Sequence, residues 1–218
     1  MSSGTQAGGA GFLARYDALR DHLPGDAAVR AAAAAAFRQA GLPGGTSQRR
    51  SEAWKYTSLR PVAETAFMTP AGGNAIKVDL SRSIPCFTRF ADTPVFGPLP
   101  RPDRDPLVAL NTMLAEDGAV LRVPAGVNGG TVRIDSIGSG PAAYHPRHVI
   151  HLAPGSVLTV LDVATGQGSY LHNPVTEITV GAGAHLTHIR LVDDAPDAFH
   201  LATIYTGIEE GGTYDSFS

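Results

Sequence analysis

The sequence predicts a mixed α and β protein, in which an N-terminal helical domain is followed by the first coils of a parallel β-helix (solenoid), truncated in this chain. Apolar residues recur at helical spacing near the N-terminus. Beyond Gly118 the apolar period becomes two, which is typical of strands, and segments then repeat at a constant offset of 28 residues. We therefore assign residues 1–105 to the helical domain with an irregular, proline-rich connection, and residues 106–218 to the start of an incomplete β-helix domain.

Two helices are predicted before residue 44. The first has an apolar face at positions i, i+4, i+7 and i+11, formed by Phe12, Tyr16, Leu19 and Leu23. The second can begin with Asp26 as N-cap, because an aspartate side chain accepts hydrogen bonds from the first free N–H groups of a helix. It contains the alanine tract of residues 31–36 and is predicted to end at Gly41, with Pro43 just beyond.

A third helix is predicted to start near Pro61, because proline suits the first helical position, where its missing N–H costs nothing. Residues 70–106 contain many prolines and few periodic apolar residues, so we expect irregular structure with short extended pieces. A short helix over residues 106–116 then presents three leucines on one face and is closed by Gly118; these are Leu107, Leu110 and Leu114.

The strand region contains a repeat. Three segments align without gaps at the 28-residue offset: residues 148–161, 176–189 and 204–217. Their turn glycines coincide, namely Gly155, Gly183 and Gly211. A strand, a glycine turn and a second strand in every unit are typical of a solenoid whose coils bury their apolar faces by stacking. A β-sandwich of hairpins is the alternative, but it would keep this register only by coincidence. Because the pattern stops within a strand, we expect the chain to be a fragment of a longer protein.

Composition excludes several classes of partner. The formal net charge is -3, and the 17 Lys and Arg residues are spread thinly, so no basic stripe for nucleic acid or anionic lipid is expected. No apolar run reaches the roughly 18–20 residues that cross a bilayer, and no secretion signal is evident. We expect a cytoplasmic protein without nucleic-acid or membrane partners. Cys86 is the single cysteine and is expected to be a small buried residue, so the chain alone cannot form a disulfide or a thiolate cluster site.

The histidines do not predict a metal site. His145, His148 and His151 lie three apart, as do His185 and His188, and strand side chains alternate faces with period two. Neighbours in each series therefore point to opposite faces. A better pair for a metal ion is His172 and His200, which lie 28 residues apart and would stack on adjacent coils. We nevertheless expect this pair to be a solvent-facing histidine ladder.

No catalytic set is predicted either. In the repeat register Asp162 falls opposite Arg190, and Glu177 falls opposite Tyr205, so no two acids line up for general acid–base work. Three further aspartates, all expected in a solvated turn with Pro196, are Asp193, Asp194 and Asp197. Nucleophile elbows, phosphate-binding loops and zinc-protease motifs are absent from the sequence. We predict no catalytic and no metal-binding residues.

A family resemblance lies at the junction of the second and third helices. The chain reads FRQAGLP from Phe37 and RSEAWKYTSL from Arg50. This resembles the SufD subunit of the SUF iron–sulfur cluster assembly system, in the SufB/SufD family, which has F-x3-G-L-P followed by R-x-E-x-W-K-Y-T-x-L. Residues 173–191 also look like core coils of that family. The signature residues, which we expect to be structural, are Gly41, Leu42, Pro43, Glu52, Trp54, Lys55, Tyr56 and Thr57.

The resemblance implies a non-catalytic scaffold rather than an enzyme. SufD-like proteins pair with a SufB-like paralogue through their β-helices, and a SufC-like ATPase docks on the C-terminal helical domains. Clusters assemble at the interface of the paralogues, on residues expected beyond Ser218. We therefore expect no stably bound cofactor here, and an iron–sulfur cluster only transiently in the full complex. The alternatives are a β-helix enzyme acting on polysaccharide and a stand-alone protein-binding module.

Overall fold

The computed structural model describes residues 9–43, 58–70, 75–81 and 87–218. The helices are α1 (Ala10–Leu19), α2 (Ala27–Ala40), α3 (Arg60–Glu64) and α4 (Pro106–Leu114). None of these helices has the length and apolar character required to span a bilayer. The strands before the repeat are β1 (Ile76–Leu80), β2 (Phe87–Arg89), β3 (Ala119–Val123), β4 (Asn128–Ser139) and β5 (Ala143–Tyr144). The strands that follow are β6 (Arg147–Leu152), β7 (Val157–Gln167), β8 (Leu171–His172), β9 (Val175–Val180), β10 (His185–Asp193), β11 (Phe199–His200), β12 (Thr203–Ile208) and β13 (Thr213–Phe217).

Both ends of α2 follow the predicted capping residues, whereas α1 ends at Leu19, before Leu23, and α4 ends at Leu114, before Gly118. The Asp26 carboxylate accepts a hydrogen bond of 2.7 Å from the backbone N–H of Ala28, and this confirms Asp26 as the N-cap of α2. Gly41 ends the same helix with a φ of 65°, a left-handed conformation that favours glycine. Asp105 caps α4 in the same manner, with a bond of 2.8 Å from the N–H of Leu107.

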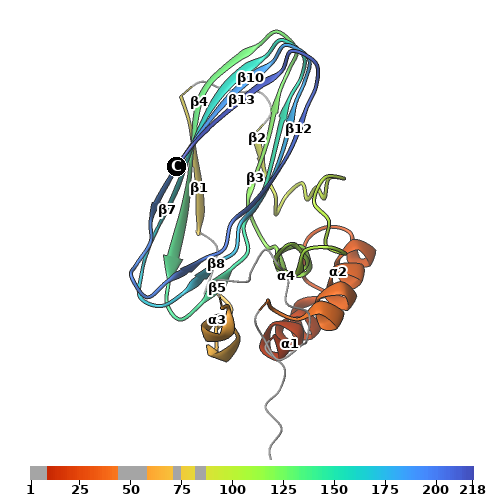
Figure 1. Cartoon of the computed structure of the whole chain (residues 1–218), viewed down its shortest axis with the longest axis vertical. Coiled ribbons are helices and arrows are strands. Elements are labelled where there is room, and N and C mark those ends of the chain that lie inside the picture. Colours follow the sequence, from red (N-terminus) through yellow and green to blue (C-terminus); the bar gives the residue numbers. More distant parts are fainter. Residues whose placement is uncertain (1–8, 44–57, 71–74, 82–86) are drawn as a thin grey trace, which may run out of the picture.

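The strands from β3 onward form a parallel β-helix, as predicted. Its coils build two long sheets, in the order β4-β7-β10-β13 and β3-β6-β9-β12, joined at one end by a short sheet of β5, β8 and β11 (Figure 1). His148 pairs with Thr176, and Thr176 pairs with Ile204, so the 28-residue register is confirmed. Parallel pairing of strands one coil apart rules out the sandwich of hairpins.

The first coil is one residue longer than the others. Asn128 pairs with Val157, an offset of 29, whereas Thr131 pairs with Thr159, an offset of 28. Two glycines therefore lie opposite one residue, and this β-bulge contains Gly130 with a φ of 72°. The bulge absorbs the extra residue and brings later coils into the common register.

Short antiparallel strands cover one end of both long sheets. β1 pairs antiparallel with β4, and β2 pairs antiparallel with β3. They come from the proline-rich segment, for which the sequence predicts irregular structure with short extended pieces. Because an open sheet edge presents unpaired N–H and C=O groups, these strands satisfy the edge of the first coil. Both strands precede residue 106, so this part of the first sequence range forms part of the solenoid.

The helices cover the outer face of the short sheet. Leu171 of β8 and Ala143 of β5 belong to the same buried cluster as the apolar side chains of α1, α2 and α4. Arg15 of α1 also donates a hydrogen bond of 2.9 Å to the carbonyl of Ala143. Figure 1 shows these helices beside the end of the coil that carries β5 and β8. The helical cluster is therefore anchored on the short side of the solenoid.

The interior of the solenoid has two parts of different polarity. Near the glycine turns it is filled by stacked aliphatic side chains from both long sheets, including Val132, Leu152, Leu158, Ile178 and Leu186. Toward the short sheet the inward positions become polar, because the alternation that places Leu158 and Val160 inside also places Asp162 there. Buried polar groups of this kind persist in proteins when they are paired.

Candidate functional site

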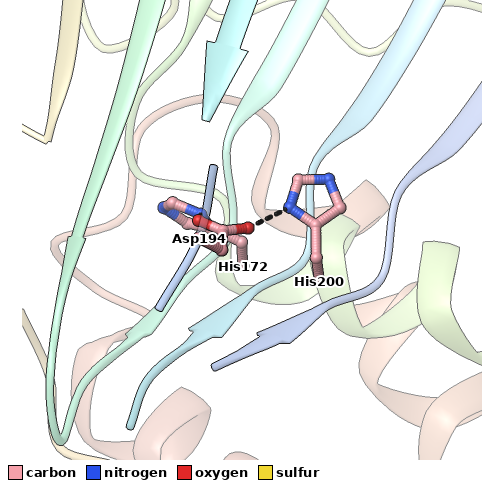
Figure 2. Close-up of side chains that lie close together, drawn as sticks. All are labelled: His172, Asp194 and His200. Carbon is pink, nitrogen blue, oxygen red and sulfur yellow. Dashed lines mark hydrogen bonds and ion pairs between the residues drawn. The ribbon is translucent and has the colours of Figure 1, made fainter. Parts of the chain in front are cut away.

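Three side chains meet in the polar half of the solenoid: His172, Asp194 and His200. His172 from β8 and His200 from β11 are register partners on adjacent coils, and Asp194 comes from the loop between β10 and β11. Figure 2 shows the Asp194 carboxylate lying between the two imidazole rings. Each of the three offers a ligand atom within 4.8 Å of the others, and no other such group of three occurs within the described ranges.

The Asp194 carboxylate accepts hydrogen bonds from three neighbours. Nδ1 of His172 lies 3.2 Å from Oδ1, and Nδ1 of His200 lies 2.7 Å from Oδ2. The hydroxyl of Tyr170 donates to Oδ1 at 2.6 Å. Each imidazole therefore directs Nδ1 toward the carboxylate, which fixes the orientation of both rings.

The backbone position of Asp194 explains its inward direction. Asp193 pairs with Thr165, so Asp194 occupies the coil position that Gly138 and Gly166 hold in the two preceding coils. A Cβ atom on either glycine would overlap the ring of Tyr170. The two glycines thus make room for the tyrosine, and the third coil places a carboxylate where its hydroxyl ends.

Hydrogen bonding dominates the electrostatics of Asp194. Burial alone would raise the pKa of this carboxyl, but the hydrogen bonds from His172, His200 and Tyr170 outweigh it and hold the pKa well below its ordinary value. Burial and the same carboxylate raise the pKa of the Tyr170 phenol, which keeps its proton. Asp194 is therefore an anion held among donors, a state that also suits binding of a cation.

A second polar group lies deeper in the same interior. His188 of β10 places Nε2 3.6 Å from the Asp162 carboxylate and Nδ1 3.1 Å from the hydroxyl of Tyr214. His148 of β6 accepts a hydrogen bond of 3.1 Å from the N–H of Ala119. Burial opposes ionisation of Asp162, but its contact with His188 lowers the pKa of the carboxyl on balance. We interpret this second polar group as structural, because its side chains contact one another and the backbone.

The other predicted histidine groups do not come together. His151 is exposed and bonds Thr179, whereas His148 is buried inside the coil, as alternation of faces requires. His185 faces outward and pairs with Asp215 at 3.0 Å, on the opposite face from His188. The predicted separation of these histidines is confirmed.

The expectation of a solvent-facing histidine ladder is wrong for His172, which is 1% exposed. The expectation that Asp194 lies in a solvated turn is also wrong, since its side chain is 8% exposed and contacts both imidazoles. Asp193 and Asp197 are exposed as predicted. The sequence feature that predicts the inward direction of Asp194 is the 28-residue offset. It aligns Asp194 with Gly166 one coil earlier and with Gly138 two coils earlier.

The family-signature residues lie elsewhere. Gly41 ends α2, and Leu42 and Pro43 after it are buried. Leu42 joins the apolar cluster of the helices. The remaining signature residues and the single cysteine lie outside the described ranges: Glu52, Trp54, Lys55, Tyr56, Thr57 and Cys86.

His145 gives a pH-dependent prediction. Burial and, to a smaller extent, the nearby Arg15 cation together lower the pKa of His145 to about 3. The unfolded chain takes up a proton near pH 6.5, so His145 stabilises the fold fully above that pH and progressively less as the pH falls toward 3. Lowering the pH from about 7.5 to about 5 should therefore lower the free energy of unfolding by about 2 kcal/mol through His145.

The variant His145→Gln, which keeps a hydrogen-bonding group toward Asn173, should therefore lose about 2 kcal/mol less than the unsubstituted protein over this interval. Urea unfolding at both pH values measures the difference. The exposed His22→Gln variant is the control and should keep the original pH dependence. An unchanged dependence in His145→Gln would show that this histidine has the same pKa in the folded and the unfolded chain.

One comparison with known proteins matches part of the chain to a family model. Residues 133–218 match the model described as "SUF system FeS cluster assembly, SufBD core domain", a range that contains His172, Asp194 and His200. A search of curated proteins found no match to the chain. The family match supports the SufB/SufD family and a part in iron–sulfur cluster assembly for this β-helix.

Proposed function

We propose that this chain is a SufD-like scaffold subunit of an iron–sulfur cluster assembly complex and is non-catalytic on its own. The observation that carries the proposal is that the match to the SufBD core domain falls on the parallel β-helix with its 28-residue register. The tryptophan-containing signature in the N-terminal part adds support, because it resembles SufD in a different region of the sequence.

The proposed partners are a SufB-like paralogue and a SufC-like ATPase, and the proposed location is the cytoplasm. A β-helix suits assembly with a related β-helix, because its coils are stabilised by neighbouring coils and its sheets extend by adding strands. The cluster is then a cargo of the complex. Iron–sulfur clusters are held by several cysteine thiolates, and this chain contains one, so we propose that it holds no cluster stably by itself.

Deletion of the gene tests the proposed function. The specific activity of an iron–sulfur enzyme such as aconitase should fall about tenfold under iron limitation, whereas malate dehydrogenase, which has no cluster, should keep its activity. A plasmid-borne copy should restore the loss. Equal aconitase activity with and without the gene would contradict a role in cluster assembly.

A second arm uses the purified chain. After anaerobic reconstitution with iron and sulfide, acid-labile sulfide should stay far below the amount expected for one cluster per chain. A stoichiometric sulfide content would overturn the proposal that the chain holds no cluster alone.

A further inference from the structure

We propose that His172, Asp194 and His200 form a binding site for one divalent first-row transition-metal ion, such as Fe²⁺, Co²⁺ or Zn²⁺. The inference concerns the chain alone and does not rest on the proposed function. The donor set is two imidazole nitrogens and one carboxylate oxygen on adjacent coils. Imidazole suits Zn, Fe and Co, whereas Ca²⁺ and Mg²⁺ prefer sites made of oxygen atoms alone.

The donor spacing fits an ion of this size. Metal–ligand distances of about 2.0–2.2 Å with tetrahedral or octahedral angles place donor atoms about 3.0–3.5 Å apart. The 3.2 Å between Nδ1 of His172 and Oδ1 of Asp194 lies in this range. The 2.7 Å between Nδ1 of His200 and Oδ2 is a hydrogen-bond distance. When the ion binds, the Nδ1 proton is released to solvent, and a small rotation of the carboxylate opens this distance to the required separation.

One buried nitrogen of the group is without a partner. Nε2 of His172 has no hydrogen-bond partner among the described residues, although the side chain is 1% exposed. Nδ1 is the nitrogen that faces Asp194, so Nε2, on the other side of the ring, is not a donor of the proposed set. Nε2 of His145 and of His148 is unpaired among these residues as well, so the proposed site rests on the Nδ1 and carboxylate geometry.

A cavity adjoins the two histidines. It has a volume of about 30 Å³ and is lined by both imidazoles together with Asp162, Thr176 and Arg190. That volume holds one or two water molecules. Asp194 does not line this cavity, so the space for a water ligand lies on the side of the two imidazoles.

Tyr170 supports the carboxylate from outside the donor set. Its hydroxyl donates to Oδ1 of Asp194, and its ring is fixed against Gly138 and Gly166. Ligating carboxylates are commonly oriented by such hydrogen bonds, whose removal weakens metal affinity about 10–100-fold. Tyr170 is therefore a positioning residue for the proposed site.

Cobalt binding tests the proposal. The full chain, purified with EDTA and without a histidine tag, is dialysed and titrated anaerobically with Co²⁺, which gives visible d–d absorption when nitrogen ligands bind. We expect one Co²⁺ per chain and competition by Zn²⁺. The His200→Gln and Asp194→Asn variants should each lose affinity at least about 100-fold, and Tyr170→Phe at least about tenfold.

The matched control is His185→Gln, which disrupts an exposed His–Asp pair with a distance of 3.0 Å and should leave Co²⁺ binding unchanged. Circular dichroism checks that each variant is folded. His200→Gln provides the decisive measurement, because His200 is partly exposed and its replacement leaves the buried ring of His172 in place. Absence of stoichiometric binding to the unsubstituted chain would overturn the site. Equal affinity in His200→Gln and the unsubstituted chain would do so as well.

Discussion

Replacing Arg30 with alanine is expected to lower the free energy of unfolding by about 3–5 kcal/mol. The Arg30 side chain is buried, with 1% exposure, and its guanidinium donates to the backbone carbonyls of Pro24, Thr112, Met113 and Ala115. Three of these carbonyls belong to the end of α4, where a helix leaves its last C=O groups without intrahelical donors. Alanine would leave them buried and unpaired.

The guanidinium remains a cation in this position. Burial lowers the pKa of Arg30 to about 10, so the side chain is still charged at neutral pH. It also lies 5.1 Å from the centre of the Phe96 ring, a distance at which a cation is attracted to an aromatic face. Because a lysine keeps the charge but cannot supply the planar fork of donors, Arg30→Lys should recover less than half of the lost stability.

Urea unfolding of Arg30→Ala, Arg30→Lys and the unsubstituted protein measures these differences. Arg38→Ala is the control, because Arg38 is an exposed arginine on the same helix and its loss should change stability by less than about 0.5 kcal/mol. Equal unfolding midpoints for Arg30→Ala and Arg38→Ala would show that the carbonyls of α4 find other donors.

The second large effect is expected for Gly138→Ala, which should cost about 3 kcal/mol. The new methyl group would overlap the ring of Tyr170, which is 0% exposed. The ring cannot move aside easily because its hydroxyl is bonded to Asp194 at 2.6 Å. Interiors packed at this density absorb an added methyl group only by shifting side chains or backbone.

Thermal unfolding measures the loss of stability in Gly138→Ala. A double-substitution cycle with Tyr170 tests whether the overlap with the Tyr170 ring causes this loss. Tyr170→Ala removes the ring, so the pair Gly138→Ala and Tyr170→Ala should be more stable than the sum of the single effects predicts. Gly11→Ala, a helical glycine whose Cβ would meet nothing within 4 Å, should be neutral or slightly stabilising. Additive effects of the two substitutions would place the origin of the loss outside the Tyr170 contact.

The register of the solenoid was predictable because the pairing repeats the sequence offset. In a parallel β-helix, residues that align at the repeat distance are also hydrogen-bonded neighbours, as His148 and Thr176 are. The antiparallel strands β1 and β2 follow no repeat, so only short extended pieces could be expected there. The longer first coil was missed because the bulge before Thr131 interrupts the pattern.

Single buried polar residues were harder to predict than the fold. Arg30 precedes an alanine tract, and nothing in the helical pattern shows that its guanidinium reaches the end of another helix. Together with Asp193 and Asp197, Asp194 forms a sequence pattern that is typical of an acidic turn. Only its alignment with two glycines one and two coils earlier shows that it points inward, toward His172.

The constant offset of the coils also has a kinetic consequence. Every parallel pairing after the bulge joins residues 28 apart, so closing each new coil costs the same loop entropy, about 3 kcal/mol plus a constant. A coil recovers this cost only when it stacks on a finished neighbour. Folding of the solenoid should therefore be limited by formation of the first pair of coils, after which each further coil is added in a downhill step of similar rate.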